Sequence, residues 1–204
     1  MTSGPQWLLL PDARPFYEAL CDFGDAGHWQ PEHMLALFAA ESDLTPLARN
    51  KYQYQGLSQL GEKELRNLGW RPESMGDFCA ARPEVQVQYT AAYYAEWRRQ
   101  HRIPEWTSPG HLMAANLAPA HLARADQVVY SRKEHPKQYR ANEICDRNGD
   151  GVIDWQDCSD YVTWVVNARC PARFQLALTG LNQVRALRLA GDALDAARAL
   201  TRTG

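Results

Sequence analysis

The sequence predicts an all-α fold, and three observations support this prediction. Apolar residues recur at helical spacing, as Leu35, Phe38 and Ala39 do. Residue types that begin and end helices separate the apolar segments. These segments show no alternation of apolar and polar residues with period two, so we expect at most a short hairpin or ribbon near Gln127 to Tyr130.

The composition is that of a folded protein with a sizeable core. The chain has 204 residues, of which 45% are hydrophobic and 23% are charged. This length favours one main domain with an appendage. The formal net charge is −2 and the isoelectric point is near 6.3, which argues against nucleic acid as a partner, because binding to phosphates needs a basic face.

Six helices are expected in the first 120 residues. Pro31 and Pro83 fit the first turn of a helix, and Ser108 precedes a proline as an N-cap. Gly69 fits a C-cap, after which Trp70 should enter the core. The expected positions are 15–21, from 31, 62–68, 74–80, 83 to about 102, and from 109.

Local signals also predict details of these helices. The glycine-rich segment 24–27 should form a turn, and Ser74 and Asp77 have capping-box spacing. In the longest helix, an aromatic stripe at spacing three to four should face the core, although any one ring of it could instead bind substrate. The stripe consists of Val85, Tyr89, Ala92, Tyr93 and Trp97.

The C-terminal tail has apolar residues spaced among alanines and arginines from Pro171 onward. Gly191 and Asp192 should break this segment, and a final amphipathic helix should reach about Leu200. We expect the tail helices to pack on the main domain, with a partner-binding helix as the alternative.

Glu41 is the principal candidate for catalysis. It lies where the apolar helix that starts at Pro31 should end, just before a polar loop that contains Gly56. Apolar surroundings disfavour a carboxylate and raise its pKa. A carboxyl group with a raised pKa is suited to general acid catalysis near neutral pH.

The residues around Glu41 carry a family resemblance. Glu41-Ser42, then Ala48, then Gly56-Leu57-Ser58-Gln59 match in order and spacing the signature of the soluble-type lytic transglycosylases. These enzymes share a lysozyme-like fold with goose-type lysozymes. Ser58 stands where the family usually has methionine.

A second fragment, Met113 to Pro119, resembles the family's Ala-Tyr-Asn-Ala-Gly-Pro segment. Ala115 replaces the tyrosine and Ala118 replaces the glycine, so no role for that tyrosine is carried over. The resemblance covers roughly residues 15 to 125, and it implies a lysozyme-like transglycosylase domain in residues 1–125.

The resemblance implies cleavage of the β-1,4 bond between N-acetylmuramic acid and N-acetylglucosamine in the glycan strands of peptidoglycan. Glu41 would protonate the glycosidic oxygen and then take the proton of the muramoyl C6 hydroxyl, which gives a 1,6-anhydro product without water. Gln59, the backbone around Ser58, and Asn116 would hold the sugar.

Two alternatives remain open. A muramidase like the goose-type lysozymes would hydrolyse the bond, and an inverting hydrolase needs a second carboxylate about 6.5–9.5 Å away. Asp43 and Asp77 are available for that role. A non-catalytic phage or secretion component that binds peptidoglycan is the other alternative, although binding alone does not need the acid.

Residues 146–157 match the EF-hand calcium loop at every ligand position. Gly151 allows the sharp turn, and Asp157 stands in place of the usual glutamate, as in dockerin-type loops. The expected ligands are Asp146, Asn148, Asp150, Val152 through its carbonyl, Asp154 and Asp157.

Helices over Pro136 to Cys145 and Trp155 to Ala168 should flank this loop. We expect a structural Ca²⁺ ion that fastens the helices of residues 126–204 to the main domain and takes no part in the chemistry.

The cysteines Cys21, Cys79, Cys145, Cys158 and Cys170 are odd in number and irregular in spacing, so at least one thiol is unpaired within the monomer. A disulfide between two of the last three is one possibility, and buried thiols are the other.

The N-terminal stretch, up to Leu10, has no basic region and only a short apolar run, so we expect no secretory signal and no membrane span. An enzyme of the cell wall would then be made in the cytoplasm. It would reach the periplasm or wall through a holin, a phage tail or a secretion machine. An inhibitor or immunity protein is a further conceivable partner.

Overall fold

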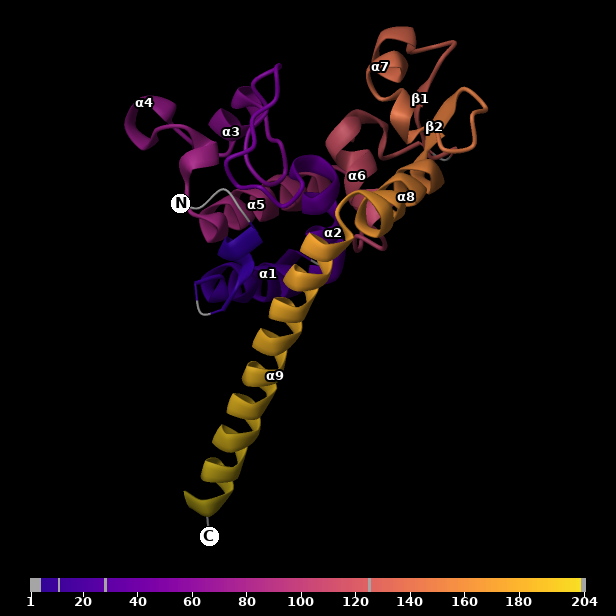
Figure 1. Ribbon diagram of the computed structural model, residues 1–204. Coiled ribbons are helices and arrows are strands. Elements are labelled where there is room, and N and C mark those ends of the chain that lie inside the picture. The colour runs from indigo at the N-terminus through magenta and orange to yellow at the C-terminus, as the bar shows by residue number, and fades with distance from the viewer. Residues whose placement is uncertain (1–4, 11, 28, 125, 203–204) are drawn as a thin grey trace.

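The computed structural model describes residues 5–10, 12–27, 29–124 and 126–202. Helices account for 65% of the structure and strands for 6%, which confirms the all-α class (Figure 1). Within these ranges, no helix combines the length and the apolar character that a membrane crossing requires. Residues 1–4 of the N-terminal stretch lie outside the description.

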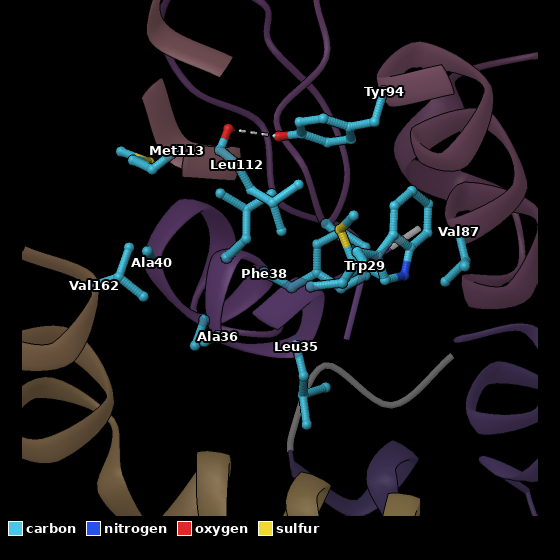
Figure 2. Close-up of a cluster of buried hydrophobic side chains, with 14 of the residues drawn as sticks. Trp29, Leu35, Ala36, Phe38, Ala40, Val87, Tyr94, Leu112, Met113 and Val162 are labelled. Atoms are coloured by element: carbon cyan, nitrogen blue, oxygen red, sulfur yellow. Dashed lines mark hydrogen bonds between the residues drawn. The ribbon is translucent and has the colours of Figure 1, made fainter. Parts of the chain in front are cut away.

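Helix α2, Pro31–Ser42, lies at the centre of the molecule. It is buried on almost every side, because its residues are apolar all round. Figure 2 shows its residues Leu35, Phe38 and Ala40 among side chains of neighbouring helices, including Leu112 and Val162. The C-terminal end of this central helix carries Glu41.

Helix α1, Arg14–Gly27, is longer than predicted. The predicted end at Cys21 and the predicted turn at residues 24–27 are both wrong. A Cβ atom on Gly24 would lie 3.0 Å from the ring of Pro31. The glycine therefore serves a close approach between α1 and the start of α2, which its sequence neighbours do not reveal.

Helix α5, Pro83–His101, begins where the proline predicts, and the predicted stripe matches its core face in part. Tyr93 is buried, and Val85 packs on the core while partly buried. Tyr89 and Trp97 are only partly buried, and Ala92 is exposed. The stripe is thus shifted by about one residue from the true core face, which includes two polar residues. The buried residues of α5 are Gln86, Val87, Thr90, Ala91, Tyr93 and Tyr94.

Small helices cover the side of the molecule near α5. Helix α3, Glu62–Asn67, ends one residue earlier than predicted with Leu68 as its C-cap, and Gly69 follows in a left-handed conformation. Trp70 is buried as predicted. The single helix predicted over 74–80 is wrong. Helix α4, Pro72–Met75, and a short 3₁₀ helix, Phe78–Ala80, replace it.

The capping box predicted for that segment is also absent. The hydroxyl of Ser74 donates to the carbonyl of Arg71, and Gly76, at φ +73°, ends α4. The carboxylate of Asp77 instead pairs with Arg49 at 2.8 Å.

Two short strands form an antiparallel ribbon. Strand β1, Val128–Ser131, fits the ribbon expected near Gln127, and it pairs with β2, Val152–Asp154. Tyr130 lies opposite Ile153 in this register. The ribbon therefore joins the acidic loop to the segment that follows α6, Pro109–Leu117.

The flanks of the acidic loop are helical over the predicted spans, but each consists of two helical elements. Helix α7, Pro136–Ala141, and a 3₁₀ turn, Glu143–Cys145, precede the loop. Helix α8, Trp155–Trp164, follows it and continues as a π-helical turn, Val165–Arg169.

Helix α8 crosses α6 at very short range. A Cβ atom on Gly110 would lie 2.5 Å from the backbone nitrogen of Ser159, so only glycine fits at this crossing. Ala125, the expected boundary between two domains, lies outside the described residues. The helices on either side of it nevertheless pack directly on each other.

Helix α9, Pro171–Arg202, is continuous, so the break predicted at Gly191 and Asp192 is wrong. An isolated glycine costs a helix only about 1 kcal/mol relative to alanine. Leu181 and Val184 of the first half are buried against the core. The second half extends away from the body (Figure 1), and its exposed apolar residues include Leu187, Leu189 and Leu194.

Ion pairs hold the first half of α9, and Arg188 just beyond it, to the core. Arg173 pairs with Asp43 at 2.6 Å, and Arg188 pairs with Asp22 at 2.6 Å. Arg185 pairs with Glu32 at the start of α2. The expected packing of this half on the main body is therefore present.

All five cysteines are free and buried. The structure therefore contains the buried thiols and not the disulfide that the sequence left open.

The buried imidazole of His111 on α6 makes stability depend on pH. The ring stacks on Trp155 at 4.1 Å between centroids, and neither of its nitrogens has a hydrogen-bond partner among the described residues. Burial lowers the pKa of His111 to about 4. The unfolded chain thus binds this proton more readily, and stability is lost as the pH falls from about 6.5 towards 4.

His111→Phe keeps the stacking and cannot be protonated. We expect its stability advantage over the wild type to grow by about 1–2 kcal/mol between pH 7 and pH 4, as measured by urea unfolding. Glu41 titrates in the opposite sense, so the difference between the two proteins, and not either curve alone, isolates His111. A difference that does not change with pH would contradict this account.

Candidate active site

Glu41 is fixed in place by the end of α2. Asp43 adopts a left-handed conformation, with φ 55°, and its amide donates to the carbonyl of Ala39. The hydroxyl of Ser42 is buried and donates to the carbonyl of Phe38 at 2.9 Å. These bonds end the helix sharply and leave Glu41 with a defined orientation.

The carboxyl group of Glu41 is adapted to carry a proton near neutral pH. Burial raises its pKa to about 7, and a hydrogen bond from Asn116 opposes part of this rise. The amide nitrogen Nδ2 of Asn116 lies 2.8 Å from Oε1 of Glu41. Both protonation states are therefore populated at pH 7.

Asn116 joins two of the segments that the sequence singled out. It lies in the last turn of α6, and the same Nδ2 donates to the carbonyl oxygen of Ser58 at 3.1 Å. The structure thus brings together Glu41, Ser58 and Asn116. It is the backbone of Ser58 that takes part, because its hydroxyl is buried against Thr90 at 2.7 Å.

Gln59 has a different role from the one expected. Its Nε2 donates to the carbonyl of Gly56 at 2.9 Å and to that of Ala48 at 3.3 Å. Its side chain is almost fully buried, and its backbone is left-handed with φ 50°. The side-chain amide of Gln59, which was expected to hold the sugar, therefore bonds the backbone of the loop between Ala48 and Gly56.

The spacing of the motif has a physical reason in this loop. The amide of Gly56 donates to the carbonyl of Ala48 at 2.9 Å, so Ala48, Gly56 and Gln59 form one hydrogen-bonded cluster. Gly56 has φ +77°, and a Cβ atom there would lie 2.6 Å from Oε1 of Gln86. The motif shapes the loop that presents the Ser58 carbonyl to Asn116.

Sequence reasoning missed Gln86, which is fully buried on α5. Its Oε1 accepts from the amide of Leu57 at 2.8 Å. Its Nε2 donates to the carbonyls of Ala81, at 3.0 Å, and Pro46, at 3.2 Å. The sequence contains a signal for this buried face, because Gln86 and Thr90 have the i, i+4 spacing of residues on one side of a helix. The prediction instead placed the aromatic stripe, on the adjacent face, against the core.

A cavity of about 830 Å³ lies between α3 and α5 and is lined in part by Glu64, Tyr93 and Trp97. The pKa of Tyr93 is raised chiefly by burial, and the carboxylates of Glu64 and Glu41 add to the rise. Part of the aromatic stripe thus borders a cavity near the acid. Glu64 is a second carboxylate near Tyr93 that the sequence did not suggest.

The two carboxylates weighed for a hydrolase are engaged elsewhere. Asp43 pairs with Arg173 of α9, and Asp77 pairs with Arg49. A base that activates water is more effective when no cation holds its charge. These ion pairs disfavour Asp43 and Asp77 as the base.

The first half of the acidic loop is stabilised by its own amides. The carboxylate of Asp146 accepts from the amides of Gly149, at 2.8 Å, and Gly151, at 3.0 Å, and from the hydroxyl of Tyr139. Asn148 accepts from the amide of Asp150 at 2.9 Å, and Asp150 accepts in turn from the amide of Val152 at 2.8 Å.

The second half forms a capping box at the start of α8. Asp154 accepts from the amide of Asp157 at 2.9 Å, and Asp157 accepts from the amide of Asp154 at 3.2 Å. Asp157 is 3% exposed. Its pKa is raised by burial, and the carboxylates of Asp154 and Asp146 add to the rise.

The acidic loop offers the type of donor atom that calcium prefers. All its donors are oxygens, and none of the loop's four aspartates is part of an ion pair within the described residues. In the described parts of the chain, no three His, Cys, Asp or Glu side chains gather closely enough to form a metal cluster. A cation here would relieve the repulsion felt by the buried carboxylate of Asp157.

The acidic loop lies closer to Glu41 than its sequence position indicated. Cys145 directly precedes the loop, and its pKa is raised to about 12 by burial, with Glu41 as the next contributor. Glu41 also raises the pKa of Tyr161 on α8. Helix α8 packs on both α2 and α6, the two helices that carry Glu41 and Asn116.

Comparison of the chain with protein-family models, with curated proteins and with solved structures found no match.

Asn116→Ala is expected to raise the pKa of Glu41, because it removes a hydrogen bond that stabilises the carboxylate form. A general acid acts in its protonated form, so the alkaline limb of the pH–rate profile should move up by about one unit. Initial rates of wall solubilisation from pH 5 to 9 measure this shift.

Gln59→Ala is the matched comparison for Asn116→Ala. It should lower the melting temperature and leave the pH profile in place, because its amide bonds the loop and not the acid. Both variants should lose less activity than Glu41→Gln does. A pH profile of Asn116→Ala that coincides with the wild type would show that Asn116 does not act on Glu41.

Proposed function

We propose that the protein cleaves the β-1,4 bond between N-acetylmuramic acid and N-acetylglucosamine in peptidoglycan, as a lytic transglycosylase. The observation that carries this proposal is the partly buried Glu41, whose pKa is raised to about 7 and which Asn116 orients. The match of Glu41, Ala48 and residues 56–59 to the family signature supports it.

One carboxyl group performs both proton transfers in this proposal. Protonated Glu41 donates to the glycosidic oxygen as the bond breaks. The resulting carboxylate takes the proton of the muramoyl C6 hydroxyl, which attacks C1 and closes the 1,6-anhydro ring. Asn116 holds Oε1, so the proposal assigns both proton transfers to Oε2. A pKa near the working pH suits a group that must both give and accept a proton.

Hydrolysis is the second candidate, and Glu64 is the observation that favours it. Glu64 lines the cavity beside Tyr93, and both Glu64 and Glu41 contribute to the raised pKa of that tyrosine. In a muramidase, Glu64 would activate water in place of the C6 hydroxyl. Binding without cleavage is the least supported alternative, because a binder has no use for an acid with a raised pKa.

We further propose that residues 1–125 form a lysozyme-like domain and that residues 146–157 bind Ca²⁺ as an EF-hand-type loop. The ligands would be Asp146, Asn148, Asp150, the carbonyl of Val152, Asp154 and Asp157. The ion would fix the path of the loop between α7 and α8. The site of action would be the periplasm or cell wall, reached through a phage, a holin or a secretion machine.

Mass spectrometry of the muropeptides released from purified sacculi tests the proposal. Anhydro ends are expected. Reducing ends from the wild type, lost in Glu64→Gln, would establish the hydrolase. Absence of any release by the folded protein would overturn both.

A further inference from the structure

A pocket of about 600 Å³ lies between two segments that are far apart in the sequence. One is the loop that follows α2, and the other is α7. In Figure 1 these segments form two neighbouring prominences above α2 and α6. The pocket is lined by Lys51, Tyr52, Pro136, Lys137, Arg140 and Ala141.

The pocket gathers positive charge without a compensating carboxylate. Lys51, Lys137 and Arg140 are exposed, and none of them has a carboxylate within 4 Å among the described ion pairs. The nearby acids have other partners: Glu143 pairs with Arg132 at 3.6 Å, and Asp146 is bonded within its own loop. In a chain of net charge −2, this is a local excess of cations that favours an anion.

An aromatic ring completes the pocket. Tyr52 is 67% exposed, and Nζ of Lys51 lies 5.0 Å from the centroid of its ring. An exposed ring beside cations can cover the apolar part of a ligand while the cations bind its charge.

Both walls of the pocket are attached to the surroundings of Glu41. The loop that carries Lys51 is closed by the cluster of Ala48, Gly56 and Gln59, next to the Ser58 carbonyl that Asn116 contacts. Helix α7 leads through the following turn and the acidic loop to α8, which packs on α2 and α6, the helices that carry Glu41 and Asn116. The pocket is therefore built on the same segments that position Glu41 and Asn116.

We propose that this pocket binds the carboxylates of the peptide branch carried by the glycan, an inference that rests on the proposed function. The acetylated sugars of the strand are neutral, and the peptide branch supplies the negative charge. Lys51 from one wall, and Lys137 with Arg140 from the other, bind this branch together. The protein thereby prefers strands that carry peptides to bare strands.

The test measures binding in the Glu41→Gln background, so that it does not depend on cleavage. The probes are a soluble disaccharide that carries its acidic peptide and the same disaccharide without it. We expect Lys51→Gln and Lys137→Gln/Arg140→Gln each to weaken binding of the first probe, by about fivefold to thirtyfold for the double variant. Binding of the second probe should not change.

Arg14→Gln/Arg66→Gln is the matched control, because it removes two positive charges from exposed surface pairs elsewhere. This control should leave the affinity for the peptide-bearing probe at the level of the Glu41→Gln parent. Equal weakening by the control and by Lys137→Gln/Arg140→Gln would overturn the pocket as a specific site.

Further outcomes separate this inference from the proposed function. Peptide-dependent binding that is lost in the pocket variants supports the pocket even if the wild type cleaves nothing. If the wild type cleaves the wall but the Glu41→Gln protein binds both probes equally, the pocket is not a peptide-binding site and the proposed enzymatic function still stands. Stronger binding of a glycerol-phosphate polymer than of the peptide-bearing probe would overturn the assignment of the occupant.

Discussion

Glu41→Gln is expected to lower the rate of wall cleavage by a factor on the order of 10²–10⁴, while the protein remains folded. The amide keeps the volume of the carboxyl group and can still meet Asn116, but it cannot donate a proton to the leaving oxygen. Release of muropeptides from sacculi measures the loss. Glu62→Gln removes an exposed carboxylate that pairs with Arg66 on the surface, and it should retain full activity.

The Glu41→Gln variant also reports on the pKa of Glu41. The folded-state pKa of about 7 is above the ordinary value of 4.5 for a glutamate, so the stability that the protonated form contributes is complete below about pH 4.5 and is lost as the pH rises through 7. Glu41→Gln should therefore be more stable than the wild type at pH 8, by roughly 1–3 kcal/mol. More than a tenth of the activity in this variant would exclude Glu41 as the acid.

Removal of Ca²⁺ is expected to destabilise the protein. Binding to the folded state alone adds about 2.7 kcal/mol when the ion is at a hundred times its dissociation constant. For a chain of this length, that corresponds to a melting temperature roughly 5–10 °C higher in millimolar Ca²⁺ than in EGTA. Asp146→Ala/Asp150→Ala should abolish the difference.

Asp192→Ala/Asp195→Ala is the matched control, since both carboxylates are exposed on the projecting half of α9. Its response to Ca²⁺ should equal that of the wild type. Equal melting temperatures of the wild type with and without the ion would exclude a structural role for Ca²⁺. An unchanged melting temperature with lost activity would assign the ion to the chemistry.

Helix starts were predictable from the sequence because their signals are local. Pro31, Pro83 and Ser108 each begin a helix where the chain itself supplies the needed geometry or cap. The errors at Gly24 and Gly191 have a common cause. A glycine in a sequence signals either a turn or a helix position without a side chain. At Gly24 the close approach of Pro31 explains the helix position, whereas a Cβ atom at Gly191 would meet nothing within 4 Å and the helix continues through it.

The candidate site was predictable to the extent that a short motif encodes it. Glu41, Asn116 and the Ser58 backbone meet as the family signature implies. The true role of Gln59 and the existence of the Gln86 network were not predictable in the same way. Both depend on hydrogen bonds between segments whose approach no local pattern specifies.

The close crossing of α6 and α8 at Gly110 has a consequence for how the chain can change over generations. Asn116 lies two turns beyond Gly110 on α6, and Asp157 lies half a turn before Ser159 on α8. A larger residue in place of Gly110 would displace both the acidic loop and Asn116, the residue bonded to Glu41. Substitutions in these two helices must therefore be compatible with each other, so the segments before and after residue 125 should diverge together and not as exchangeable modules.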